Sequence, residues 1–163
     1  MSIREGNLPD KLSELIVLAV NDMEALDRQE YLPVSRVWHE KMQWWDENDE
    51  AREVCVVCLA GAVMSRQMGF GHDDSGELYI RDSNSNDRKK LVALELVRVL
   101  NFIPAVAMFY AIPAQLVHGE AKDLGIKVRN KYLMSNAFYS WKTWNYIKPA
   151  YLYVADKLKK MGY

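Results

Sequence analysis

Arg52-Glu-Val-Cys-Val-Val-Cys-Leu-Ala-Gly-Ala-Val-Met-Ser65 is the stretch on which the fold of this chain depends. From Val54 to Met64 it is apolar on every side, which predicts a helix that is buried all round rather than an amphipathic one. The run is too short to cross a bilayer. Gly61 would let a neighbouring helix approach closely, and Gly69 is suited to end the helix.

The same stretch contains both cysteines of the chain, Cys55 and Cys58. A zinc knuckle needs two further ligands at close spacing, but the nearest histidines, His39 and His72, lie about 15 residues away on either side. A redox pair would need an exposed, electropositive helix start. Buried cysteines commonly behave as small apolar residues. We therefore interpret the pair as packing residues and expect no metal and no cofactor.

The rest of the chain also favours helices. Apolar residues recur at helical spacing over about residues 8–27, from Val34 toward Trp44 and Trp45, and again beyond Asp87. Pro149 is suited to the start of a terminal helix. Residues 71–87 form a polar connector, with room for one short strand or hairpin near 77–81. The sequence thus predicts a mainly α fold, a single helical domain over 1–163 built as a bundle of about six helices.

One uncharged run, Val99–Val117, approaches the length of a membrane span. Pro104 and Pro113 would break it into short helices suited to a buried core, so we expect no membrane association. The first twenty residues lack a secretory signal, and two cysteines make no disulfide framework. A cytoplasmic location is expected.

No strong catalytic motif is present, and we expect no catalytic residues. The chain has three histidines, and neither a phosphate-binding glycine loop nor a nucleophile elbow is evident. An enzyme alternative would use His39, His72 and the loop at Asp73 and Asp74 as a hydrolytic site.

The net charge of −1 conceals a gradient along the chain. Residues 1–56 carry 13 acidic and 6 basic residues, whereas residues 126–163 carry 8 basic residues and only Asp156 as an acid. Such asymmetry is informative. Either the two ends pack together and neutralise each other, or the charges serve recognition. In the second case the acidic run Asp46, Glu47, Asp49 and Glu50 could imitate nucleic-acid phosphates toward a basic groove.

The basic C-terminal third is also rich in aromatic residues, including Trp141, Trp144 and Tyr146. Three interpretations are open. These residues could anchor a protein partner, since Trp and Tyr dominate binding hot spots. They could stack on single-stranded nucleic acid. They could also simply fill the core between short helices.

The segment Val57-Cys-Leu-Ala-Gly-Ala62, followed by Gly69 and a second amphipathic helix, resembles a core helix of small uncharacterised phage and prophage proteins with a C-L-x-G-A pattern. The resemblance covers about 50 residues and implies no known catalysis. It implies a phage accessory protein that binds and inhibits or redirects a host protein, such as one of a defence or nucleic-acid-handling system. The alternative function is nucleic-acid binding by the C-terminal third. The sequence leaves the oligomeric state open.

Overall fold

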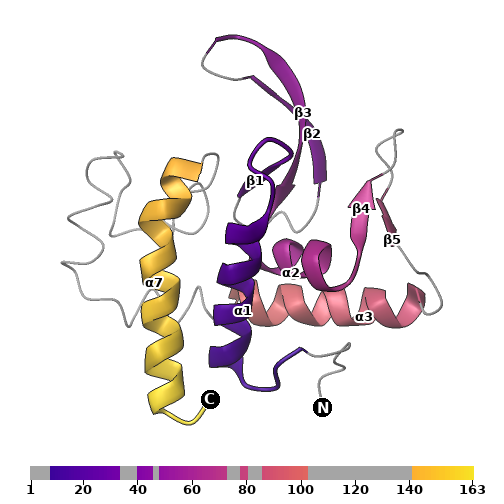
Figure 1. Cartoon of the computed structure of the whole chain (residues 1–163). Coiled ribbons are helices and arrows are strands. Elements are labelled where there is room, and N and C mark those ends of the chain that lie inside the picture. The colour runs from indigo at the N-terminus through magenta and orange to yellow at the C-terminus, as the bar shows by residue number, and fades with distance from the viewer. Residues whose placement is uncertain (1–7, 34–39, 46–47, 73–77, 81–85, 103–140) are drawn as a thin grey trace.

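The computed structural model describes residues 8–33, 40–45, 48–72, 78–80, 86–102 and 141–163. Helices α1 (Leu12–Ala25) and α7 (Trp141–Lys160) lie side by side and run in opposite directions (Figure 1). A small sheet continues from the upper end of this helix pair. Helix α2 (Leu59–Gln67) packs against α1, and α3 (Asn86–Val97) packs against α2. The π-helical turn η1 (Arg98–Phe102) extends α3 and contacts both α1 and α2.

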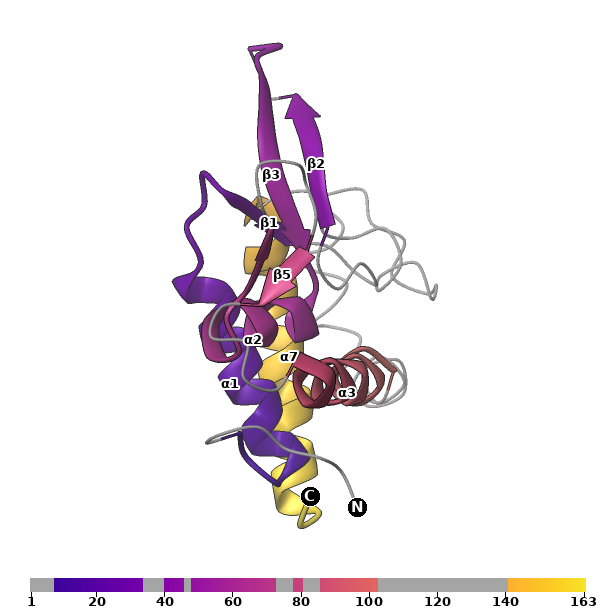
Figure 2. The ribbon, with the colours of Figure 1, turned by 90° about the vertical axis from the view of Figure 1, so that its right-hand side faces the viewer.

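The sheet contains β1 (Tyr31–Pro33), β2 (Glu40–Trp45) and β3 (Ala51–Val57) in the order β1-β3-β2. β1 is parallel to β3, and β2 is antiparallel to it. Figure 2 shows the β2–β3 hairpin projecting well beyond the helices. A second antiparallel pair joins β4 (Phe70–His72) to β5 (Leu78–Ile80).

The quoted stretch is not one helix, and the prediction for Val54–Met64 is wrong in its first half. Residues up to Val57 form β3, and only Leu59 onward is helical. The valine-rich half favours a strand because β-branched side chains pack well on a pleated surface. A short apolar run is consistent with either a buried strand or a buried helix, so the periodicity of the sequence could not distinguish the two structures. Gly69, with a φ of 75°, follows the helix as expected.

The six-helix bundle is therefore also wrong. The described residues form four α-helices, the π-turn and the two small sheets. Residues 40–45, which the sequence placed in a helical segment, pair with β3 in register from Glu40 opposite Val56 to Trp45 opposite Ala51. Backbone pairing across the hairpin supplies hydrogen bonds that residue spacing alone did not reveal.

Other predicted elements are confirmed in part. The helix expected over 8–27 is α1, and a short strand near 77–81 is present as β5, paired with residues 70–72. Pro149 lies inside α7 rather than at its start. The run Val99–Val117 lies outside the described residues beyond position 102. None of the helices in the described parts of the chain has the length and apolarity needed to cross a membrane.

The hydrophobic core lies where α2 meets its neighbours. Every residue of α2 from Leu59 to Ser65 is buried, and its partners come from α1, β3, α3 and η1. α7 covers the remaining side of α1 with Trp144, Tyr151 and Val154, all of them buried. The sheet joins this core through Leu32, Val54, Val56 and Val57, and Met42 and Trp44 of the hairpin pack against it.

Candidate functional site

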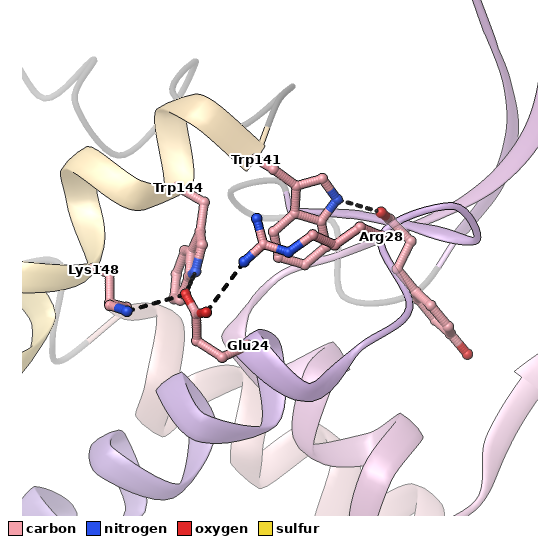
Figure 3. A network of polar contacts seen from close by, with 6 residues as sticks. Glu24, Arg28, Trp141, Trp144 and Lys148 are labelled. Atoms are coloured by element: carbon pink, nitrogen blue, oxygen red, sulfur yellow. Dashed lines mark hydrogen bonds and ion pairs between the residues drawn. The ribbon is translucent and has the colours of Figure 1, made fainter.

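Trp144, one of the predicted partner anchors, is 1% exposed. Its indole N–H donates a hydrogen bond to the carboxylate of Glu24 on α1, as Figure 3 shows. On its other side the ring lies 6.3 Å, centroid to centroid, from the ring of Tyr151. The aromatic body is thus buried while its polar edge is paired, which is the arrangement expected of a core tryptophan.

Glu24 is the centre of a polar network between α1 and α7 (Figure 3). Lys148 Nζ lies 3.3 Å from one carboxylate oxygen and Arg28 NH2 lies 3.2 Å from the other. Burial by itself raises the pKa of Glu24, but the hydrogen bonds from Trp144 and Lys148 and the two positive charges outweigh it. The pKa of Glu24 is therefore lowered, and its charge helps to hold the two helices together.

Trp141 is also occupied by contacts within the chain. Its indole N–H donates to the backbone carbonyl of Tyr31 at 2.9 Å, and the Arg28 guanidinium lies 4.5 Å from its ring centroid. Trp141 is only partly exposed. Tyr146 belongs to α7, but its side chain lies outside the described ones. Of the three interpretations of these aromatics, the geometry of Trp141 and Trp144 favours packing within the chain.

Of the predicted acidic run, Asp49 and Glu50 lie between β2 and β3, at the end of the hairpin. Asp49 and Glu50 are exposed, and Asp46 and Glu47 lie outside the described residues. Asp49 has a φ of 58°, a left-handed conformation that Asp tolerates better than most residues. The backbone turn thus places two carboxylates at the extreme end of the projecting hairpin.

Trp45 stands beside these carboxylates as the last residue of β2, and it is 61% exposed. Its cross-strand neighbour is Ala51, whose small side chain leaves the ring uncovered on that strand. Trp45 was not among the predicted site residues, because the sequence pattern placed the Trp44-Trp45 pair in a helix. In a strand, neighbouring side chains point to opposite faces, so only one of two adjacent tryptophans can face the core. Trp44 is the less exposed of the two. We call Trp45, Asp49 and Glu50 the hairpin tip.

The cysteines lie in different environments. Cys55 is partly exposed within β3, and Cys58 is 2% exposed at the position that precedes α2. Burial raises the pKa of the Cys55 thiol to about 12, against the smaller opposing effects of a backbone hydrogen bond at Glu40 and the charge of Lys41. A thiol of that pKa is a poor nucleophile near neutral pH. No metal-binding group of His, Cys, Asp and Glu occurs among the residues that the structure describes.

The residues of the enzyme alternative lie almost entirely beyond the described structure. His39, Asp73 and Asp74 fall outside it, and of His72 only the backbone, in β4, is described. The hydrolytic hypothesis therefore receives no geometric support.

A buried carboxylate, Asp22, links α1 to α2. Gln67 Nε2 donates to both of its oxygens, at 3.0 and 3.1 Å, and Arg66 Nε lies 4.0 Å from one of them. Burial is the largest influence and raises the pKa of Asp22, while Gln67 and Arg66 act in the opposite direction. The group is enclosed by the fold, and we assign it a structural role.

A groove of about 380 Å³ runs between α1 and α7 at the end of the molecule opposite the hairpin. Its residues are Ser13, Glu14, Val17, Leu152, Ala155, Asp156 and Lys159. Val17 and Leu152 are 39% and 38% exposed. The Oγ of Ser13 is buried and has no hydrogen-bond partner among the residues that the structure describes. The groove thus combines an apolar wall with one unsatisfied hydroxyl.

Comparisons with known proteins identify no relative: no family model matches the chain, and neither a curated protein nor a solved structure matches it. The two surface features, the hairpin tip and the groove, are accordingly interpreted from their own chemistry.

Proposed function

We propose that this protein is a non-enzymatic, phage-type accessory protein that binds a host protein and inhibits or redirects it in the cytoplasm of a bacterial cell. The single observation that carries the proposal is the hairpin tip. There an aromatic ring that is 61% exposed stands beside two exposed carboxylates on the part of the molecule that projects farthest from the core. The phage origin rests on the resemblance of the segment at residues 57–62.

The chemistry of the tip suits a protein partner with a basic groove. Large exposed aromatic rings bury much area at low entropic cost, and tryptophan is enriched among hot-spot residues. Carboxylates at the rim of such a contact steer the encounter toward positive charge and exclude acidic competitors. A nucleic-acid-handling or defence protein offers such a groove, and Asp49 and Glu50 would occupy it in place of phosphates.

Nucleic-acid binding by the C-terminal third is less well supported by the described residues. A stacking platform needs exposed aromatic faces and unengaged cations. Trp144 is instead buried, and Lys148 is paired with Glu24. Protein binding through the hairpin tip therefore remains the better proposal.

Capture from bacterial lysate tests the proposal with matched variants. The tip variant combines Trp45→Ala with Glu50→Lys. Position 50 is chosen over position 49 because Asp49 has a positive φ, and most other residues would be strained there. The control, Lys157→Glu, changes an exposed charge on α7, far from the hairpin. We expect a specific host protein to be retained by wild type and control, to be lost with the tip variant, and to be displaced by duplex DNA.

Retention of the same protein by the tip variant would show that the binding surface lies elsewhere. Capture of nucleic acid alone by wild type would replace the proposal with the alternative function. Far-ultraviolet circular dichroism of each variant excludes misfolding as the cause of a loss.

A further inference from the structure

The direction of the backbone hydrogen bonds in the sheet can be derived from one contact. β2 is an outer strand of the sheet, next to β3 (Figure 2). The N–H of Cys55 in β3 donates to the carbonyl of Glu30 at 2.8 Å, so Cys55 turns its backbone groups toward β1. Because this direction alternates along a strand, the β3 residues that turn toward β2 are Arg52, Val54 and Val56.

Two residues of β2 therefore direct their backbone groups away from the sheet. Met42 and Trp44 stand opposite Val54 and Arg52 and bond to them within the hairpin. Gln43 and Trp45 alternate with these residues, so their N–H and C=O groups point outward. Within the described part of the chain no hydrogen bond is made to these outward groups. Such an edge readily accepts another strand, and natural proteins usually protect it.

The two faces of the hairpin beside this edge differ in chemistry. Met42 and Trp44 lie on one face, and both pack against the hydrophobic core. Gln43 and Trp45 lie on the other face, where the ring of Trp45 is 61% exposed. A strand added at the edge would thus have apolar neighbours on one face and an amide and an aromatic ring on the other.

The hairpin also carries an excess of negative charge. Its described residues, 40–45 and 48–57, include four acids and two bases, a net charge of −2: Glu40, Asp49, Glu50 and Glu53 against Lys41 and Arg52. Lys41 Nζ lies 3.2 Å from a carboxylate oxygen of Glu53, so the base on β2 is already neutralised. These charges favour a basic segment at the edge over an acidic one.

We propose that the outer edge of β2 is the docking site for an extended segment of a protein partner in which basic and apolar residues alternate. The segment adds to the sheet as a further antiparallel strand, a mode of recognition that combines backbone hydrogen bonds with side-chain contacts. Its basic residues exchange backbone hydrogen bonds with Gln43 and Trp45, and one of them lies over the ring of Trp45. Its apolar residues lie beside Met42 and Trp44.

The inference deepens the proposed function and rests on it for the identity of the partner as a host protein. It adds that backbone hydrogen bonds along β2 hold the partner, together with the side chains of the hairpin tip. Directly opposed residues of an antiparallel pair share a face, so the backbone pairing also fixes the face on which the basic residues lie.

Fluorescence polarisation with a labelled peptide of alternating Lys and Val, about ten residues long, tests the inference on the full chain. Gln43→Pro removes the outward N–H and places a proline ring at the edge, while the hydrogen bonds to β3 are spared. It should weaken peptide binding roughly 30-fold, the value of two hydrogen bonds. Gln43→Ala, the matched control, keeps the N–H and should bind within about twofold of wild type.

Two N-methylated peptides test the same geometry without any change in the protein. Methylation of the Lys nitrogens removes the donors that face β2 and should weaken binding roughly 30-fold. Methylation of the Val nitrogens alters groups that face away from β2 and should have little effect. A peptide of alternating Glu and Val should bind more weakly than the Lys/Val peptide, because the hairpin is acidic.

The inference is overturned if wild type does not bind the Lys/Val peptide, if Gln43→Pro binds it as wild type does, or if both methylated peptides bind equally. Wild type that sediments as a dimer, dissociated by Gln43→Pro, would assign the edge to a second copy of the chain instead. Circular dichroism shows whether the proline variant is folded, and the methylated peptides decide the matter if it is not.

Capture from bacterial lysate separates this inference from the proposed function. A host protein that is retained by Gln43→Pro but lost with the tip variant would be held by side chains alone, so the proposed function would stand and the inference would fall. If the peptides behave as expected but wild type captures no host protein, only the proposed function falls.

Discussion

Trp144 and Trp45 are both tryptophans, but one lies in the core and the other on the surface. Trp144 is 1% exposed on α7, with its N–H bonded to Glu24 and its ring beside Tyr151. Trp45 is 61% exposed on β2, with Ala51 as its cross-strand neighbour. Composition alone pointed to the C-terminal third as a binding surface, because residues 126–163 carry 9 of the 18 aromatic and 8 of the 21 basic residues of the chain. In the described part of this region, Trp141 and Trp144 instead make contacts within the chain, to Tyr31 and Glu24.

The same contrast applies to the charges. Part of the charge gradient is neutralised within the fold, since acidic Glu24 from the N-terminal third pairs with Lys148 from the C-terminal third. The remaining charges separate in space, with Asp49 and Glu50 at the hairpin end and Lys157, Lys159 and Lys160 at the other end of the molecule. The pairing of Glu24 with Lys148 supports the interpretation that the two ends of the chain neutralise each other, whereas a role of the other charges in recognition stays a prediction.

The largest expected effect on stability comes from removing the side chain of Trp144. Trp144→Ala should lower the free energy of unfolding by about 3–5 kcal/mol, because it leaves a large cavity and removes the hydrogen bond to Glu24. Trp45→Ala, the matched control, should change it by no more than about 0.5 kcal/mol, as surface substitutions usually do. Urea unfolding of both variants followed by circular dichroism measures the difference.

Equal losses for the two variants would contradict the comparison. They would mean that the hairpin contributes to the core as much as α7 does. A smaller loss for Trp144→Phe than for Trp144→Ala would separate the contribution of the ring from that of the N–H.

The next effect concerns Glu24. Glu24→Gln keeps an acceptor for Trp144 but removes the charge facing Lys148 and Arg28, at an expected cost of about 1 kcal/mol at neutral pH, because both cations are partly exposed. The pKa of Glu24 is lowered in the folded state, so its charge stabilises the fold above the ordinary value of 4.5. That contribution is lost as the pH falls through the lower pKa of the folded protein.

The difference in stability between wild type and Glu24→Gln should therefore shrink toward zero on acidification below 4.5. Asp22 has the opposite sign, since its raised pKa favours the fold at low pH and this contribution disappears as the pH rises. Both proteins contain Asp22, so its contribution cancels in the difference. A difference that stays constant with pH would show that the charge of Glu24 does not support the helix pair.

The sequence predicted elements whose pattern is local. α1 follows from apolar residues at helical spacing, and Gly69 follows α2 because glycine tolerates a positive φ. Cys58 is buried as a small apolar residue in the core. Each of these outcomes depends on residues a few positions apart.

What the sequence missed depends on pairing between distant segments. β1 meets β3 through contacts such as Leu32 opposite Val56, and these are invisible to a helical or alternating pattern read in one window. With the sheet unrecognised, Trp45 was assigned to a helix and its exposure was missed. Likewise, Trp144 was predicted to be a surface anchor because its partner, Glu24, lies 120 positions away and cannot be recognised from the neighbouring sequence.

The smallest expected effect on stability has the reverse sign, and it concerns Ser13 on the wall of the groove. Its Oγ is buried without a hydrogen-bond partner in the described part of the chain, so the protein bears the desolvation cost of the hydroxyl and gains nothing in return. Ser13→Ala should therefore raise the free energy of unfolding by about 0.5–1 kcal/mol, as alanine also has the higher helix propensity. Thermal unfolding of wild type and Ser13→Ala, compared under the same conditions, measures this gain. If Ser13→Ala is instead destabilising, the hydroxyl makes a favourable contact within the folded chain.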